Sequence, residues 1–77
     1  MNIKLLKSKM VLAGDNQREL AEYLSLSPLA VSNKMTGKAQ FKAEEIGKIV
    51  WKYNLTPQET HEIFFKGVEE LETIDRG

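Results

Sequence analysis

The chain has 77 residues and no net charge at pH 7, with 11 basic and 11 acidic side chains, and this length suits one domain rather than two. It lacks cysteine, which excludes a disulfide framework and a thiolate zinc site, and its single histidine, His61, cannot assemble a metal site or a catalytic triad alone. We therefore expect one hydrophobic core without a cofactor or metal, in a protein that is not an enzyme.

Two helices are predicted before residue 25. Apolar residues recur at helical spacing from Ile3 to Met10, and Gly14 follows them where a helix commonly ends. Asp15 or Asn16 is then placed to cap a second helix. The buried positions expected in this second helix are Leu20, Ala21 and Leu24.

Both prolines follow a hydroxyl residue and mark helix starts. Ser27-Pro28 and Thr56-Pro57 each place an N-cap side chain before a proline at the first helical position, where the missing N–H is not needed. We expect the third helix over 28–35, the fourth over about 43–53 and the fifth from Thr56. No segment alternates with period two, so the predicted fold class is all-α. The inward side chains expected in the last two helices are Ile46, Ile49, Val50, Tyr53, Ile63 and Phe64.

The second and third helices together predict a helix-turn-helix. Only residues 25–27 separate them, and the small side chain of Ala21 permits a close crossing. The outer face of the third helix then projects into solvent, and a projecting helix fits the width of the major groove of DNA. This outer face comprises Pro28, Leu29, Ser32 and Asn33.

The segment from Gln17 to Lys38 resembles the helix-turn-helix of lambdoid phage repressors and Cro proteins, a class often called XRE-like. Its pattern is Gln-x-x-Leu-Ala-x-x-Leu-x-Leu-Ser-x-x-x-Val-Ser-x-Lys-x-x-Gly-Lys. Two later pieces, Phe41-Lys-Ala-Glu-Glu-Ile and Glu62-Ile-Phe-Phe, are similar to small Cro-type or modulator proteins of temperate phages of Gram-positive bacteria.

This resemblance implies a five-helix lambda-repressor-like DNA-binding domain over residues 1–66, and the composition of residues 67–77 predicts an acidic C-terminal tail. It also implies a location in the cytoplasm of a bacterial host cell. The apolar run 10–13 is too short for the core of a signal peptide or for a membrane span, which fits a soluble protein without a membrane partner.

The resemblance also implies how the chain contacts double-stranded operator DNA. The outer-face residues match positions that face base edges, where Asn33 suits adenine and Leu29 suits a thymine methyl group. Gln17 matches the residue that fixes the domain to a phosphate at a helix N-terminus. A homodimer would place two recognition helices roughly 34 Å apart, one turn of DNA. The residues expected to contact the DNA backbone are Asn16, Gln17, Ser27, Lys34, Lys38, Gln40 and Lys42.

Charge and the apolar start of the third helix leave other partners open. Residues 1–53 carry nine basic and five acidic side chains, a balance of +4, whereas 54–77 carry two and six, a balance of −4. Family members commonly have Gln, Arg or Lys where this chain has Pro28 and Leu29, and the apolar residues weaken direct base readout. A modulator or antirepressor that binds a partner repressor protein, or an antitoxin-like partner protein, is therefore an alternative to a DNA-binding regulator.

The predicted fourth helix carries two further features. Trp51 lies off its inward stripe and, with Leu55 or Phe65, would form an exposed apolar patch of the kind found at protein interfaces. Alternatively, Trp51 covers the C-terminal helix. Glu44-Glu45 opens the helix, where carboxylates favour the positive end of the helix dipole, so we do not interpret them as catalytic acids.

Overall fold

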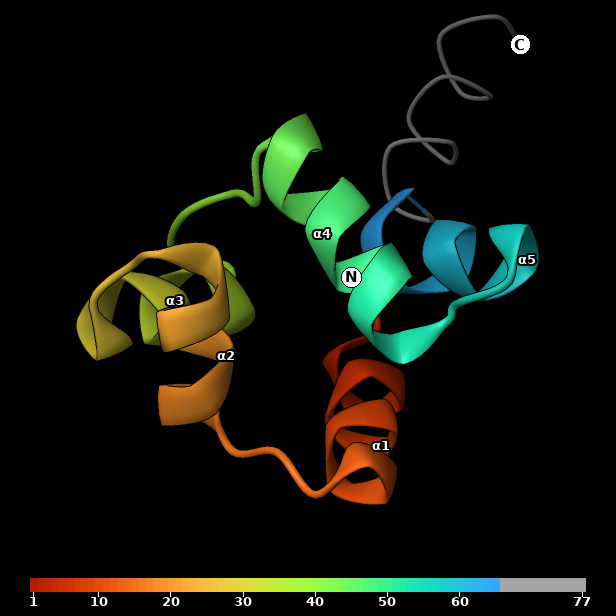
Figure 1. Cartoon of the computed structure of the whole chain (residues 1–77). Helices are drawn as coiled ribbons and strands as arrows, with labels where there is room; N and C mark the ends of the chain where they lie inside the picture. The colour runs from red at the N-terminus through yellow and green to blue at the C-terminus, as the bar shows by residue number, and fades with distance from the viewer. Residues whose placement is uncertain (66–77) are drawn as a thin grey trace, which may run out of the picture.

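Five α-helices and a closing π-helical turn form the part of the chain that the computed structural model describes, residues 1–65 (Figure 1). None of these residues lies in a strand, which confirms the all-α class, and none of these helices is long and apolar enough to cross a membrane. The expected boundary between a domain ending at residue 66 and a tail over 67–77 lies outside the described residues. In chain order the elements are α1 (Ile3–Ala13), α2 (Gln17–Leu24), α3 (Pro28–Met35), α4 (Ala43–Tyr53), α5 (Pro57–Thr60) and η1 (His61–Phe65).

Local capping explains where these helices begin and end. Asn16, rather than Asp15, caps α2, because its Oδ1 accepts the backbone N–H three residues later at 2.9 Å. The expected hydroxyl caps at Ser27 and Thr56 are both present before α3 and α5. Gly14 ends α1 with a φ of 78°, in the left-handed region that glycine adopts without strain.

One hydrophobic core joins the helices. Burial of a large aliphatic side chain stabilises a fold by about 2 kcal/mol, and α1 to α4 and η1 each contribute one that is fully buried. These five side chains are Leu6, Leu20, Val31, Ile49 and Ile63. Of the inward residues expected in the last two helices, Ile49, Tyr53 and Ile63 are buried, and Ile46, Val50 and Phe64 are half-buried against the core.

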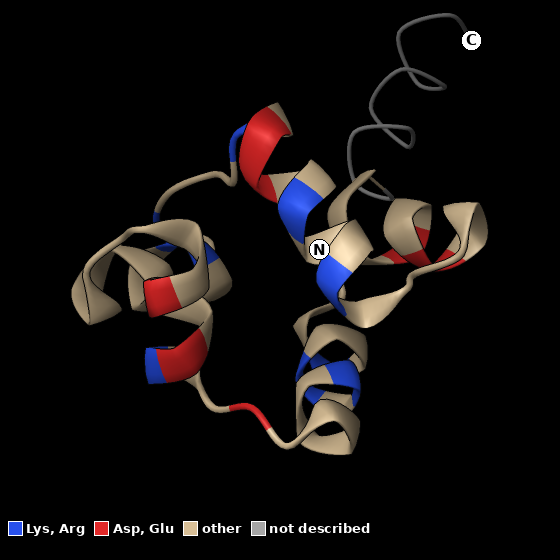
Figure 2. Ribbon diagram, viewed as in Figure 1, with Lys and Arg blue, Asp and Glu red and all other residues tan. Residues whose placement is uncertain are grey.

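The helices form two groups around this core. α2 and α3 pack against each other on one side of the molecule, and α1 contacts α4 and η1 on the other (Figure 1). An ion pair between Lys9 and Glu59 adds a link from α1 to α5. Charged residues occur along α1, α2 and α4, whereas α3 has only Lys34, near its end (Figure 2). The surface of α3 is therefore almost uncharged.

Candidate nucleic-acid interface

Local hydrogen bonds close the turn between α2 and α3. The Ser25 N–H donates to the Glu22 carbonyl at 3.1 Å, and the Leu26 N–H donates to the Ala21 carbonyl at 2.9 Å. Ser25 takes up a left-handed φ of 58°, and the Ser27 hydroxyl oxygen accepts a backbone N–H of α3 at 3.1 Å. Ala21 is 1% exposed, in agreement with its expected place in the helix pair. The turn thus sets the direction in which α3 leaves α2.

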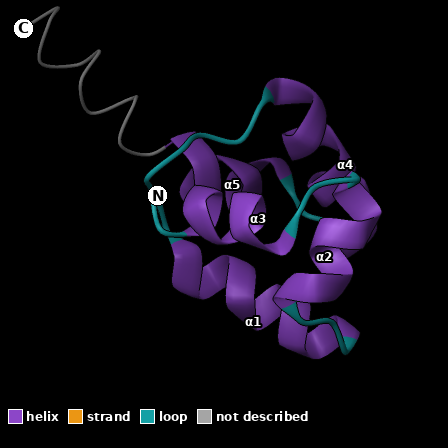
Figure 3. Ribbon diagram, turned by 90° about the vertical axis from the view of Figure 1, so that its left-hand side faces the viewer, coloured by secondary structure: helices purple, strands orange, loops and turns teal. Residues whose placement is uncertain are grey.

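The outer face of α3 is accessible. Figure 3 views the molecule from the side of α2 and α3. Val31 and Met35 are buried in the core, whereas Leu29 is 69% exposed and Ser32 and Asn33 are half-buried. Pro28, at the start of the helix, is exposed as well. All four expected base-contacting residues, Pro28, Leu29, Ser32 and Asn33, therefore retain accessible surface.

Lys34, expected to contact the DNA backbone, is not placed for that role. The residue is 9% exposed, and its Nζ donates to Oε1 of Glu45 at 2.5 Å. Lys34 follows Val31 by three positions, so helical geometry places both on the buried face of α3. The three-residue spacing from Val31 to Lys34 was therefore a signal in the sequence that Lys34 is buried. We therefore remove Lys34 from the expected phosphate contacts.

Glu45 joins α3 to the start of α4 and is a residue whose importance sequence reasoning missed. Its Oε1 also accepts the backbone N–H of Lys42 at 2.8 Å. Burial of the carboxylate opposes its ionisation, but hydrogen bonds from Lys34 and from the Lys42 backbone, with the positive charges of both lysines, outweigh burial. The pKa of Glu45 is therefore lowered, and its carboxylate remains ionised at neutral pH.

The segment between α3 and α4 carries three of the expected DNA-backbone contacts. Lys38, Gln40 and Lys42 are all exposed. The Asn33 carbonyl accepts the N–H groups of Lys38 and Ala39 at 2.9 and 3.1 Å, which holds the start of the segment against α3. A cation beside a groove-binding helix can reach a phosphate while the helix contacts bases. Lys38 has this placement.

The remaining expected backbone contacts lie at the starts of α2 and α3. Asn16 and Ser27 are exposed, but each uses its side-chain oxygen to cap its own helix. The Asn16 NH₂ group and the Ser27 O–H are still able to donate to a phosphate oxygen. Gln17 is half-buried at a hollow of about 460 Å³ that Lys7 and Gly37 also line. The start of α2 therefore lies beside the end of α3.

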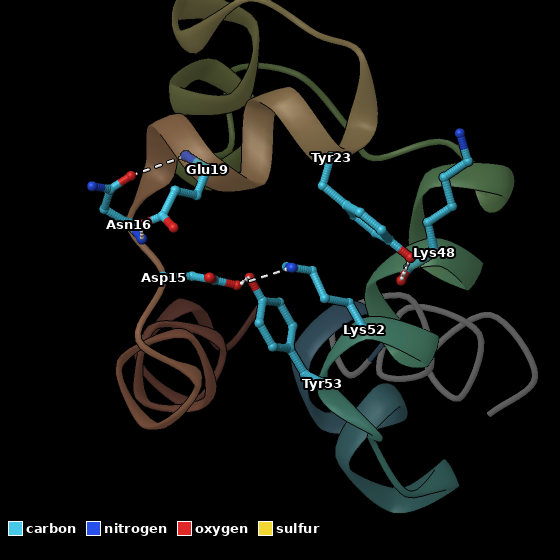
Figure 4. A network of polar contacts seen from close by, with 7 residues as sticks. All are labelled: Asp15, Asn16, Glu19, Tyr23, Lys48, Lys52 and Tyr53. Atoms are coloured by element: carbon cyan, nitrogen blue, oxygen red, sulfur yellow. Dashed lines mark hydrogen bonds and ion pairs between the residues drawn. The ribbon is translucent and has the colours of Figure 1, made fainter.

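A polar network connects α2 and the turn before it to α4 (Figure 4). The Tyr53 O–H donates to Oδ2 of Asp15 at 2.9 Å, and Nζ of Lys52 lies 3.3 Å from the same oxygen. The same Nζ lies 4.7 Å from the ring centroid of Tyr23, whose O–H donates to the Lys48 carbonyl at 3.1 Å. Burial, the hydrogen bond to Asp15 and nearby negative charge raise the pKa of Tyr53, so its hydroxyl remains a donor.

The apolar patch expected around Trp51 is exposed only in part. Trp51 is 83% exposed and Phe65 is 41% exposed, whereas Leu55 is 6% exposed and belongs to the core. The interface expectation for Leu55 was wrong. Asn54 ends α4 in the left-handed conformation, and the Leu55 N–H donates to the Val50 carbonyl at 3.1 Å, which turns the Leu55 side chain inward.

The outer face of α3 carries polar and apolar groups that are able to form hydrogen bonds and van der Waals contacts. The outer face offers the amide of Asn33, the hydroxyl of Ser32 and the apolar surface of Leu29, with the cation of Lys38 beside them. Residues 1–65 hold no group of three or more His, Cys, Asp or Glu residues placed to bind a metal ion.

Comparisons with protein-family models, with curated proteins and with solved structures find no match to this chain.

Proposed function

We propose that this chain is a transcriptional regulator of the phage-repressor and Cro type, with a lambda-repressor-like arrangement of helices, that inserts α3 into the major groove of DNA. The observation that carries the proposal is the division of α3 into two faces. Val31, Lys34 and Met35 are buried, while the four outer-face positions keep accessible surface. A helix anchored along one side and open along the other is what groove insertion requires.

Direct base contacts would come from few side chains. Asn33 is able to form two hydrogen bonds with an adenine, and Leu29 is able to contact a thymine methyl group. Ser32 offers one hydroxyl to either kind of base. Because α3 has no accessible arginine or glutamine, we expect modest discrimination between sequences and a large share of the affinity from the phosphates.

Charge within the described part of the chain supports phosphate binding. Residues 1–65 carry nine basic and seven acidic side chains, a balance of +2. Three ion pairs, Lys9–Glu59, Lys34–Glu45 and Lys52–Asp15, remove three charges of each sign and leave this balance unchanged. Lys38 and Lys42 are exposed beside α3. These two lysines are the proposed phosphate contacts.

A salt titration tests the proposal. Fluorescence anisotropy of the full chain with a pool of random-sequence duplexes should detect binding near 50 mM salt, with log affinity falling by about 0.9 per phosphate contacted for each unit of log salt. Lys38→Gln and Lys42→Gln should each weaken binding and reduce this slope by about 1, because each removes one phosphate contact.

Lys9→Gln is the matched control, because Lys9 pairs with Glu59 of α5, at the opposite end of the molecule from α3 (Figure 1). It makes the same charge change and should leave the slope unaltered. Absence of binding at 50 mM salt would overturn the proposal, as would equal effects of the three substitutions.

We propose as a second candidate that the same face binds a partner repressor protein, because Pro28 and Leu29 give the start of α3 an exposed apolar surface. Leu29→Asp separates the two candidates. It should abolish co-elution with a repressor encoded next to this chain if the partner is a protein. Retention of such a complex by Leu29→Asp, together with loss of DNA binding, would leave only the first candidate.

A further inference from the structure

The hollow beside the start of α2 is lined by both apolar and basic side chains. Its volume is about 460 Å³, and Met1, Ile3 and Met35 supply apolar lining. Lys7 lines it as well and is exposed. Lys4 lies three positions earlier, on the same face of α1, and is also exposed. The hollow therefore suits a ligand that combines apolar side chains with negative charge.

Neither Lys4 nor Lys7 has an acidic partner among residues 1–65. The lysines that form ion pairs within this range are Lys9, Lys34 and Lys52. Like charges three positions apart on a helix repel each other, so both cations gain from a nearby carboxylate. Such a carboxylate has to come from outside residues 1–65.

The described part of the chain ends close to this hollow. The Asn2 N–H donates to the Ile63 carbonyl at 3.0 Å, and Asn2 lies between two of the apolar lining residues. Phe65, two positions after Ile63, is 41% exposed. Residues 66–77 therefore start beside the hollow. Six extended residues span about 20 Å, which is enough to cross it.

The sequence of residues 66–77 matches this lining. Val68, Leu71 and Ile74 recur at every third position. No basic residue occurs between 68 and 75, and the segment carries four carboxylates, Glu69, Glu70, Glu72 and Asp75. The segment therefore offers apolar side chains for the apolar lining and carboxylates for the two lysines.

We propose that residues 66–77 bind in this hollow of the same chain, with an apolar side chain against Ile3 and Met35 and carboxylates beside Lys4 and Lys7. A segment that is joined to its site by a few residues has an effective concentration there on the order of millimolar, so a few weak contacts are enough. A separate molecule needs a much larger interface to offset its loss of free motion.

Docking of this segment would also restrict the proposed DNA interface. Gln17 lines the same hollow, and it is the residue expected to fix the domain to a phosphate. Carboxylates in this position repel phosphates and occupy Lys7. This consequence rests on the proposed function, whereas the docking itself does not.

Nuclear Overhauser contacts in the full chain, measured without DNA, test the docking. Methyl groups of residues 68–74 should show contacts with the methyl groups of Ile3 and Met35. Contacts with Trp51 or with Leu29 instead would overturn the inference, as would the absence of contacts. Contacts that disappear on dilution would also overturn it, because the segment would then come from a second copy.

Charge reversal at Lys7 gives a matched pair of variants. Lys7→Glu should shift the amide signals of residues 68–75 towards their positions in the urea-unfolded chain, because it replaces attraction by repulsion. Lys48→Glu makes the same charge change at an exposed position of α4, three residues before Trp51, and should leave these signals unchanged. A larger effect of Lys48→Glu would overturn the inference.

Anisotropy with random-sequence duplexes then tests the consequence for DNA binding. A hollow that is occupied for about two thirds of the time lowers the apparent affinity about threefold, and Leu71→Ser should restore it. Leu12→Ser, the same change at an 81% exposed position of α1, should leave the affinity unaltered. Absence of DNA binding in every variant would count against the proposed function alone. Docking contacts combined with equal affinities of Leu71→Ser and the parent would overturn the competition.

Discussion

Glu45 shows how one buried carboxylate can organise two helices. The same oxygen accepts the Lys42 N–H at the start of α4 and the ammonium of Lys34 from α3. Burial raises the pKa of a carboxyl group, but here the two hydrogen bonds and the lysine charges outweigh it and lower the pKa of Glu45. A lowered folded-state pKa adds stability above the unfolded-state pKa, and this contribution is lost as the pH falls through the folded-state pKa.

Glu45→Gln should therefore change stability in a pH-dependent manner. At pH 7 it leaves the Lys34 ammonium buried without its counter-charge, and we expect a loss of about 3 kcal/mol. The difference from the parent should shrink as the pH falls through the lowered pKa of Glu45, because the parent then loses the same negative charge. Urea unfolding followed by circular dichroism at pH 7 and pH 3 measures both values.

Glu44→Gln is the control, because Glu44 is the exposed neighbour in the same turn of α4. It should cost less than 1 kcal/mol at either pH. An equal loss for Glu45→Gln at pH 7 and at pH 3 would contradict the proposed role of the ion pair.

At the scale of elements, the ends of the helices carry the clearest strain. Ser25 ends α2 with a φ of 58°, a conformation that costs a residue with a Cβ atom about 1–2 kcal/mol. Ser25→Gly removes this cost, and the greater freedom of glycine in the unfolded chain offsets part of the gain. We expect a net gain of about 0.5–1 kcal/mol and a higher melting temperature in calorimetry.

Ser8→Gly is the matched control, because Ser8 is exposed in the interior of α1, where glycine lowers stability. We expect Ser25→Gly to raise the melting temperature and Ser8→Gly to lower it. A lower melting temperature for Ser25→Gly would mean that the Ser25 side chain has a stabilising role that outweighs its backbone strain.

Helix starts were predictable because capping is local. Ser27 and Thr56 act on N–H groups within three residues, so spacing alone identifies them. Contacts between helices were not, since Tyr53 reaches Asp15 across 38 positions and only the packing of α4 brings them together. The burial of Leu55 was predictable in part. Asparagine often ends a helix in the left-handed conformation, and Asn54 does so here just before Leu55.

The candidate site was also predictable only where local sequence pattern determines it. The outer face of α3 followed from helical periodicity, and the four accessible positions agree with it. Lys34 was predicted as a surface cation although its spacing from Val31 places it on the buried face, and a buried lysine requires a partner that spacing does not reveal. Glu45 is that partner, and it lies 11 positions away on another helix.

At the scale of the whole molecule, α2 and α3 join the rest through two kinds of contact. The core supplies Leu20 and Val31, and the network around Asp15 and Tyr53 supplies polar links to α4. Neither set includes Leu29 or another outer-face side chain. The contacts that hold the molecule together are therefore separate from the outer face of α3, which we propose contacts a partner.

Because of this separation, we expect substitutions on the outer face of α3 to leave the stability of the fold unchanged. Replacing Leu29 by Arg, Gln or Thr should leave the free energy of unfolding within about 0.5 kcal/mol of the parent, because no core contact is lost. Denaturation midpoints of such a small library measure this directly, and a large loss in most members would contradict it. With α3 as the proposed recognition helix, single codon changes at its outer face should alter binding preference without any compensating change elsewhere in the fold.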